Sequence, residues 1–494
     1  MKRCLLQACG LVFKLVVVGA LLSGCQSVQN TAQKLVEHDG DNVRLINRLT
    51  PVQVPSKLAV GLERDLMNKR ADSYGLIAVP EISNYLNGIR DRLLKASGVA
   101  NVAGRVYVAA DPTLNAMTTP DGNIFINWSL LHYLGNEDEV AAVIAHELAH
   151  NLLGHADSNV YGQYVQKTRW LHRFGLEIVV KNRDLAANYL QKGVRKGEVS
   201  QLKDLQLATM LATKVISPSW QRTQERAADL LGVDLLIAAG YNPDGMLNLL
   251  SVLKQNEDNN RKGPDWNVLG KQLMAIAQGD NRMKLYGGIG VLEMIWGHDH
   301  PDAEVRIDEI QSYLFRHYDD SQLATSYQKS NWEKVRRNTT FRKMLVAYEG
   351  ALAAHKLLEL GQVEAAYRKS MATVGAARNQ AYPAFILALS LDAMGQHREA
   401  QLALKQALDR GQEGSGKVYD KLAQILANNG KPKEAAQLMN TGYERFGRAP
   451  QMVPAIVRYQ RMSGDGKRAG EIARQCALKY PDFSDHCMAE ADQS

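Results

Sequence analysis

The segment His146-Glu147-Leu148-Ala149-His150 constrains the fold more than any other stretch of this 494-residue chain. Residues four apart on an α-helix project from the same face, so the two imidazoles can meet at one point. Asn136 followed by acidic residues at 137–139 is typical of a helix start, because a polar cap and negative charge stabilise the free backbone N–H groups. Residues 140–152 are largely apolar. The pattern therefore predicts a buried helix that carries both histidines.

Two histidines at this spacing, with a glutamate beside the first, are typical of a zinc-binding helix. A hydrolytic zinc normally has three protein ligands and an open position, so a third ligand is needed. The best candidate is Glu225, in a second apolar-periodic helix, with Asp229 one turn further along the same face. Asp229 would accept the outer N–H of a ligand histidine. We expect one Zn²⁺ per chain with ligands His146, His150 and Glu225. Glu147 would act as general base on a zinc-bound water.

Further histidines are open to interpretation. His155 would lie about 140° round a continuous helix from His150, so we interpret it as structural rather than as a zinc ligand. His300 precedes a proline and is expected to act in the active site, either by stabilising the oxyanion or by latching the zinc as a fourth ligand. His298 could take its place, and a capping or core role for His300 is the alternative.

Four segments in order along the chain resemble the gluzincin metallopeptidases, which include the HtpX-like proteases and the CAAX prenyl proteases. They are 115–122 with the strand Ile124-Phe125-Ile126, the helix 146–155, the block 225–229, and His300-Pro301 with Arg306-Ile307. The resemblance covers about residues 58–315 and implies the same three ligands and the same base. Two long stretches, about 156–218 and about 255–299, depart from the family pattern and leave the gating of the cleft open.

The resemblance further implies that this region is an endopeptidase. The strand formed by Asn123, Ile124, Phe125 and Ile126 is similar to the edge strand on which such enzymes align an extended substrate. Backbone hydrogen bonds along an edge strand ignore side-chain identity, so unfolded proteins are the expected substrates.

The N-terminus resembles a bacterial lipoprotein signal. Lys2 and Arg3 precede an apolar run from Leu15 to Leu22, and Ser23-Gly24-Cys25 follows. Cleavage before Cys25 and acylation of its thiol and amine would anchor the chain. Gln26 follows rather than aspartate, which implies the periplasmic face of the outer membrane (its inner leaflet). The alternative is a cleaved soluble protein or an uncleaved anchor.

Charge and cysteine content agree with that compartment. Loss of Lys2, Arg3 and Lys14 with the signal removes three positive charges, so the formal charge falls from +7 to about +4. So small an excess excludes a nucleic-acid-binding function class. Beyond the lipidated cysteine only Cys476 and Cys487 remain, and in an oxidising compartment we expect them to pair. Such a disulfide would contribute about 2–3 kcal/mol. Two buried free thiols are the alternative.

Glycines recur at a fixed period in the C-terminal third. Gly361, Gly395, Gly430 and Gly464 are 34, 35 and 34 residues apart, each followed five residues later by Ala366, Ala400, Ala435 or Ala469. This is the tetratricopeptide period, in which each glycine ends one helix and the alanine packs in the next. Such repeats stack into a short superhelix whose concave face binds a partner.

Together these patterns predict a mainly α, α+β chain: a gluzincin-type zinc peptidase domain with a small sheet, followed by an α-solenoid of tetratricopeptide repeats. The expected divisions are a signal peptide (1–24), a lipidated tether (25–57), the peptidase (58–315), a helical linker (316–341) and the repeats (342–494). The layout is similar to BepA-like periplasmic proteases. That resemblance implies that the protein degrades misfolded or misassembled outer-membrane proteins. It also implies that the repeats dock an assembly machine and that only the lipid contacts the membrane. The alternatives are a non-proteolytic chaperone with a latched zinc site and a repeat-based scaffold lipoprotein.

Overall fold

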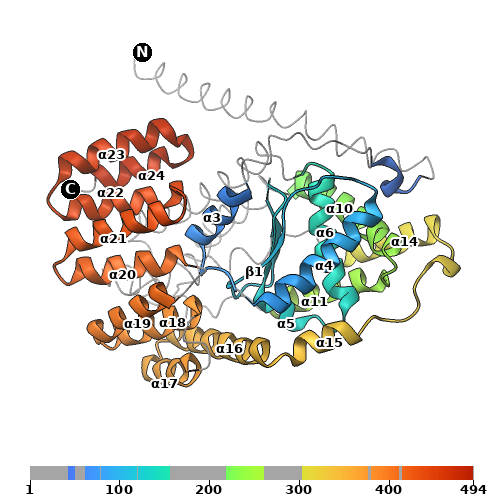
Figure 1. Ribbon diagram of the computed structural model, residues 1–494, viewed down its shortest axis with the longest axis horizontal. Coiled ribbons are helices and arrows are strands. Elements are labelled where there is room, and N and C mark those ends of the chain that lie inside the picture. The colour runs from blue at the N-terminus through green and yellow to red at the C-terminus, as the bar shows by residue number, and fades with distance from the viewer. Residues whose placement is uncertain are drawn as a thin grey trace, which may run out of the picture.

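The computed structural model describes residues 43–49, 62–77, 79–119, 121–155, 218–260, 303–375, 380–410 and 414–492. Figure 1 shows a mainly α chain with one small sheet, as predicted. Around the sheet lie η2 (Leu45–Arg48), α3 (Leu62–Asp72), α4 (Pro80–Ser97), α5 (Trp128–Tyr133), α6 (Glu137–Leu152), α10 (Pro218–Ala238), α11 (Asp244–Asn260), α14 (Ala303–His317) and α15 (Ser330–Arg337). No described helix has both the length and the apolar composition needed to cross a membrane.

Three short strands form the sheet, in the order β1-β3-β2. β1 (Val106–Ala109) pairs in parallel with β3 (Ile124–Asn127), and β2 (Ala116–Thr118) pairs with β3 in the antiparallel sense. Successive side chains on a strand point to opposite faces. One face therefore joins the main core with α4 and α6, and the other packs Phe125 and Met117 against Leu66 of α3.

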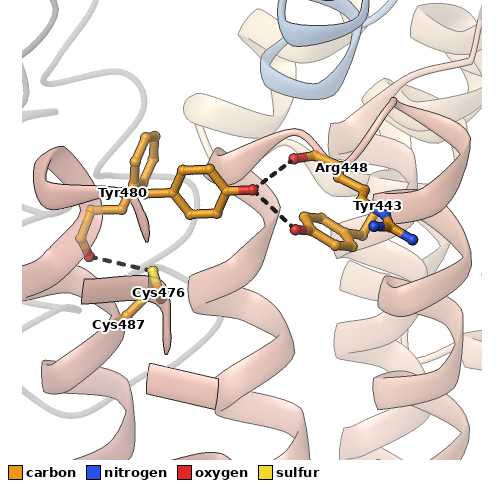
Figure 2. The surroundings of a disulfide bond; sticks show 6 residues. Tyr443, Arg448, Cys476, Tyr480 and Cys487 are labelled. Carbon is orange, nitrogen blue, oxygen red and sulfur yellow. Dashed lines mark hydrogen bonds between the residues drawn. A yellow bond between two sulfur atoms is a disulfide. The ribbon is translucent and has the colours of Figure 1, made fainter. Parts of the chain in front are cut away.

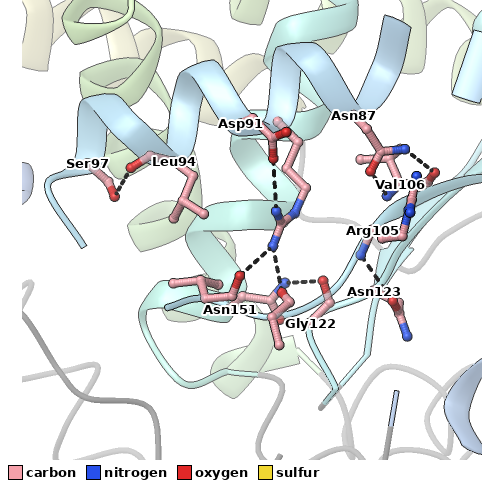
Figure 3. Close-up of polar contacts among 12 residues, drawn as sticks. Asn87, Asp91, Leu94, Ser97, Arg105, Val106, Gly122, Asn123 and Asn151 are labelled. Carbon is pink, nitrogen blue, oxygen red and sulfur yellow. Dashed lines mark hydrogen bonds and ion pairs between the residues drawn. The ribbon is translucent and has the colours of Figure 1, made fainter. Parts of the chain in front are cut away.

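The predicted position of the substrate strand is wrong. Residues 124–126 belong to β3, which is the central strand, because β1 occupies one side of it and β2 the other. Asn123, just before it, is also used inside the sheet, where its Oδ1 accepts a hydrogen bond from the backbone N–H of Arg105 at 3.1 Å (Figure 3). The backbone of β3 is thus already paired, and β2 lies at an edge of the described sheet.

The C-terminal helices follow one another in packed succession. They are α16 (Thr339–Glu359), α17 (Val363–Val374), α18 (Ala381–Ala393), α19 (His397–Arg410), α20 (Gly416–Asn428), α21 (Pro432–Arg445), α22 (Val453–Met462), α23 (Gly466–Lys479) and α24 (Ser484–Asp492). The four periodic glycines each follow a helix with φ between 72° and 88°. Because side chains disfavour this left-handed region, glycine is the residue that ends a helix in this way.

The last two helices are joined covalently. A disulfide links Cys476 of α23 to Cys487 of α24 (Figure 2). Beside it, the hydroxyl of Tyr480 lies 3.2 Å from that of Tyr443 on α21, and it also donates to the backbone carbonyl of Arg448. The disulfide therefore joins α23 to α24, and the polar contacts of Tyr480 join this pair to α21 and the residues after it.

The helical array packs directly on the sheet-containing part, an arrangement that the sequence does not reveal. Figure 1 shows α3 between the sheet and the C-terminal helices. The ring of Tyr74 meets those of Tyr382 and Phe385 edge-on, with centroids 4.7 and 5.3 Å away. The hydroxyl of Ser415 donates to the backbone carbonyl of Ser73 at 2.7 Å. These contacts are buried, so the two parts share one apolar core.

A single glycine tests how close this contact is. A Cβ added to Gly416 would lie 1.7 Å from the carbonyl oxygen of Ala71, whereas one added to Gly375 would meet no atom of the described residues within 4 Å. We expect Gly416→Ala to lower the free energy of unfolding by about 1–3 kcal/mol through overpacking. Gly375→Ala, the matched control, should be neutral or stabilising by up to about 1 kcal/mol. Urea denaturation measures both, and equal effects would contradict a tight junction.

A buried carboxylate on α10 links the segment 43–49 to α14. Asp234 of α10 accepts hydrogen bonds from the backbone N–H of Ile46 and from the hydroxyls of Tyr313 and Tyr318, at 2.7 to 2.9 Å. The guanidinium of Arg44 covers the ring of Tyr318. Burial raises the pKa of Asp234 to about 6, although these donors and Arg44 act in the opposite direction.

That pKa gives stability a pH dependence. Since the folded pKa of about 6 exceeds the ordinary 3.8, the folded state binds the proton of Asp234 more tightly than the unfolded chain does. The resulting stabilisation is complete below about pH 4 and is lost as the pH rises through 6. Between pH 4 and 7.5 the parent should lose up to about 3 kcal/mol more unfolding free energy than Asp234→Asn. Chemical denaturation at both pH values checks this, and parallel pH profiles would refute it.

Candidate metal centre

Helix α6 places two histidines side by side. The side chain of Asn136 caps the helix by accepting the backbone N–H of Glu139. Because His146 and His150 are one turn apart, their Nε2 atoms face each other at 3.2 Å. Glu147 lies between them in sequence and is 7% exposed. The predicted base and two predicted ligands therefore share one largely buried stretch of helix.

Helix α10 crosses α6 closely enough to bring a carboxylate to the histidines. Gly232 lies at the crossing, where a Cβ would be 3.4 Å from the backbone nitrogen of His146. Glu225 then places Oε2 at 3.5 Å from Nε2 of His146 and Oε1 at 3.4 Å from Nε2 of His150. One potential ligand atom from each residue lies within 4.8 Å of the others.

The donor set fits a zinc ion. Two imidazole nitrogens and one carboxylate are the ligand types of hydrolytic zinc sites, which keep a fourth position open. The three side chains converge from two helices and are all partly buried, so they are held in place rather than dispersed in solvent. His146, His150 and Glu225 would hold the ion, and no other such group occurs among the residues that the structure describes.

The outer nitrogen of His146 faces a buried ion pair. Nδ1 lies 2.9 Å from Oδ1 of Asp229, with the N–H somewhat off line. Arg306 of α14 donates to both oxygens of Asp229 at 2.7 Å, and its other terminal nitrogen lies 3.4 Å from Glu225. The arginine thus contacts a predicted ligand and the residue predicted to orient a ligand.

Neighbouring charges determine the direction in which the pKa values of His146 and Asp229 shift. Burial on its own would lower the pKa of His146, but Asp229 and then Glu225 raise that pKa to about 10. Burial on its own would raise the pKa of Asp229, but Arg306 and then His146 bring it below the ordinary value. His146 must therefore release a proton before it can bind a metal ion, so metal affinity rises with pH.

His155 lies closer to the site than the helical angle predicts. Its Nδ1 is 3.0 Å from Nδ1 of His150, on the side of that ring away from the triad. Burial, followed by the proximity of His150, lowers the pKa of His155 well below 6.5. The residue is therefore not in the triad but touches one of its members.

Other predicted site residues lie outside the described part of the chain. They are His298, His300 and Cys25. Sequence reasoning gave no role to Arg306, although it lies in a segment that carries the family resemblance. It also missed the contact of His155, which Gly154 signals: a glycine placed there ends the helix and reverses the chain.

Removal of the Arg306 charge should affect both stability and metal binding. Arg306→Met keeps much of the aliphatic stem but leaves the buried carboxylate of Asp229 without its cation. We expect a loss of about 3–5 kcal/mol in unfolding free energy and a zinc affinity about 10–100-fold lower. Denaturation and competition with a chelating dye measure these. Lys254→Met, at an exposed pair with Glu304, is the control. Unchanged zinc binding in Arg306→Met would show that Asp229 needs no cation.

Comparison with known proteins agrees with this geometry. The profile of Peptidase family M48 matches residues 80–314. The beta-barrel assembly-enhancing protease of Yersinia pestis is 24% identical over 191 residues, covering 38% of this chain and 36% of that protein. Metalloprotease YcaL of Escherichia coli K12 is 24% identical over 250 residues, covering 49% and 85%. Mitochondrial metalloendopeptidase OMA1 of Schizosaccharomyces pombe is 33% identical over 76 residues, covering 15% and 23%.

The chain therefore spans about a third of the Yersinia relative and about a quarter of the Schizosaccharomyces one. The profile match begins at the first residue of α4 and ends within α14, so it includes the three strands and both helices of the triad. Residues 80–314 of this chain are thus similar to peptidase family M48.

Proposed function

We propose that this protein is a zinc-dependent endopeptidase of the bacterial periplasm that acts on misfolded or misassembled envelope proteins. The convergence of His146, His150 and Glu225 within the family M48 region is the observation that carries the proposal. Glu147 next to the first ligand favours catalysis over a purely structural metal, because a structural site has no need of a base beside it.

The chain's own residues would divide the work as follows. A zinc ion, when bound, supplies Lewis-acid chemistry that polarises a carbonyl and makes water more acidic. Glu147 accepts the proton of the attacking water and returns it to the leaving amine. Asp229 and Arg306 keep His146 in position, and the burial of the site strengthens each of these charge interactions.

Because β3 is the central strand, we infer that β2 aligns the substrate instead. Ala116–Thr118 lies at an edge of the described sheet and beside α6, the helix that carries both histidines. An extended substrate would pair with the outward backbone groups of this strand irrespective of side chains. Unfolded chains are therefore the proposed substrates.

The cellular setting is proposed from the N-terminus and the relatives. The lipoprotein-like signal ending at Cys25 supports lipid anchoring at the outer membrane. A relative named for enhancing beta-barrel assembly supports a role in outer-membrane protein quality control. The C-terminal helices, with tetratricopeptide-like glycine spacing, would recruit a partner or substrate.

The decisive variant is Glu147→Gln in the soluble form that begins after Cys25. It keeps size and hydrogen bonding but removes the base, so casein cleavage should fall at least about 100-fold. Zinc content should stay at one ion per chain, because the ligands are untouched. Glu333→Gln, at an exposed position of α15, is the matched control and should cleave like the parent.

The outcomes separate the proposals. Equal cleavage by Glu147→Gln and the parent would refute the mechanism. Absence of cleavage by zinc-loaded parent would favour a non-proteolytic assembly factor. In the same assay, faster cleavage by His300→Ala would indicate a latch, and slower cleavage would indicate oxyanion stabilisation.

A further inference from the structure

The ligand helix α6 ends in a way that brings its C-terminal residues back onto it. Leu152 is its last residue, and Gly154 follows with φ 70°. The backbone N–H of His155 donates to the carbonyl of His150 at 2.9 Å, and that of Gly154 donates to the carbonyl of Asn151 at 3.1 Å. This pair of bonds is a Schellman motif, in which the residue after the glycine folds over the last helical turn.

In such motifs the residue after the glycine usually makes an apolar contact with the last turn. Here that residue is His155 and its neighbour is His150, a member of the metal triad. The two rings meet with centroids 5.0 Å apart, and their Nδ1 atoms are separated by 3.0 Å. His155 is 7% exposed. The helix end therefore supplies a buried hydrogen-bond partner to the far side of His150.

The direction of this hydrogen bond follows from the position of the other nitrogen. Nε2 of His150 faces Glu225 and Nε2 of His146. If Nε2 offers its lone pair to a metal ion, the ring proton of His150 must be on Nδ1. Nδ1 of His155 must then accept a hydrogen bond from that N–H, so the ring proton of His155 is on its own Nε2. That Nε2 is buried and has no partner among the described residues.

We propose that His155 is a positioning residue for the metal centre: it accepts the Nδ1–H of His150 and so selects the tautomer that presents Nε2 to the ion. The inference rests on the proposed zinc site. It gives Nδ1 of His150 a hydrogen-bond partner, in the way that Asp229 serves Nδ1 of His146. The two ligand histidines are then supported differently, one by a carboxylate and one by a neutral imidazole.

Two substitutions distinguish positioning from simple packing. His155→Leu keeps a bulky side chain but has no acceptor. His155→Asn is smaller but keeps an oxygen at the position of Nδ1. A packing role predicts that Leu is the better replacement, whereas positioning predicts that Asn is.

The readouts are the zinc dissociation constant of the full soluble chain, by competition with a chelating dye, and the Tm of the metal-free protein. We expect zinc affinity to fall about 10–100-fold in His155→Leu and less than about 5-fold in His155→Asn. Leu binding zinc as tightly as the parent, or Asn losing as much as Leu, would overturn the inference. A parent that binds no zinc would overturn the zinc site itself, and the positioning role with it.

A second pair of variants keeps the test decisive if His155→Leu fails to fold. Among the described residues, no atom lies within 4 Å of a Cβ added at Gly154, so we expect a substitution there to act through the backbone. Asparagine tolerates the left-handed conformation and valine does not. Gly154→Asn should keep the parent's zinc affinity, and Gly154→Val should lose at least about 10-fold, because it displaces His155 without altering it. Equal affinities in the two variants would overturn the inference.

Discussion

The bidentate pair between Arg306 and Asp229 is the contact on which the metal centre depends. Two carboxylates one turn apart on α10 lie beside two histidines, and Arg306 enters from α14 to contact both carboxylates. Burial on its own would raise the pKa of Asp229, but the charge of Arg306 brings that pKa below its ordinary value. Because Arg306 and Asp229 are 77 residues apart in the sequence, the site exists only when α6, α10 and α14 are all in place.

This dependence explains why the site is built on helices rather than loops. Each of two helices contributes a pair of residues that are one turn apart and so share a face: His146 and His150 on α6, and Glu225 and Asp229 on α10. Only the rotation and separation of the helices remain to be set, and the close crossing at Gly232 sets them for α6 and α10. Packed helices deform little, so the ligands are preorganised before any ion arrives.

Local patterns were sufficient to predict the helices that carry the site. Residues close together in the sequence determine three of these patterns: the periodicity of 137–152, the spacing of Glu225 and Asp229, and the glycine positions. The order of the strands depends instead on tertiary contacts, because the three apolar residues of β3 cannot specify that it pairs with both β1 and β2. The contact of His155 was missed because a helical angle was extended past Gly154, where the helix has ended. The partners of Arg306 lie too far away in sequence for any local pattern to show them.

The shared core of the two parts changes how partner recruitment has to be tested. Removal of the helices from about 345 onward would take away Tyr348, which packs on Trp128, and Tyr382, which packs on Tyr74. Both uncovered aromatic rings, Trp128 and Tyr74, belong to the sheet-containing part, and exposing them would favour aggregation. A truncated protein that cleaves poorly would therefore report lost stability as readily as lost recruitment. Exposed apolar residues on the helical array are the cleaner probes, because Met371, Leu402 and Leu478 are 51%, 52% and 85% exposed. Their substitution changes only the exposed surface of the helical array and leaves the shared core intact.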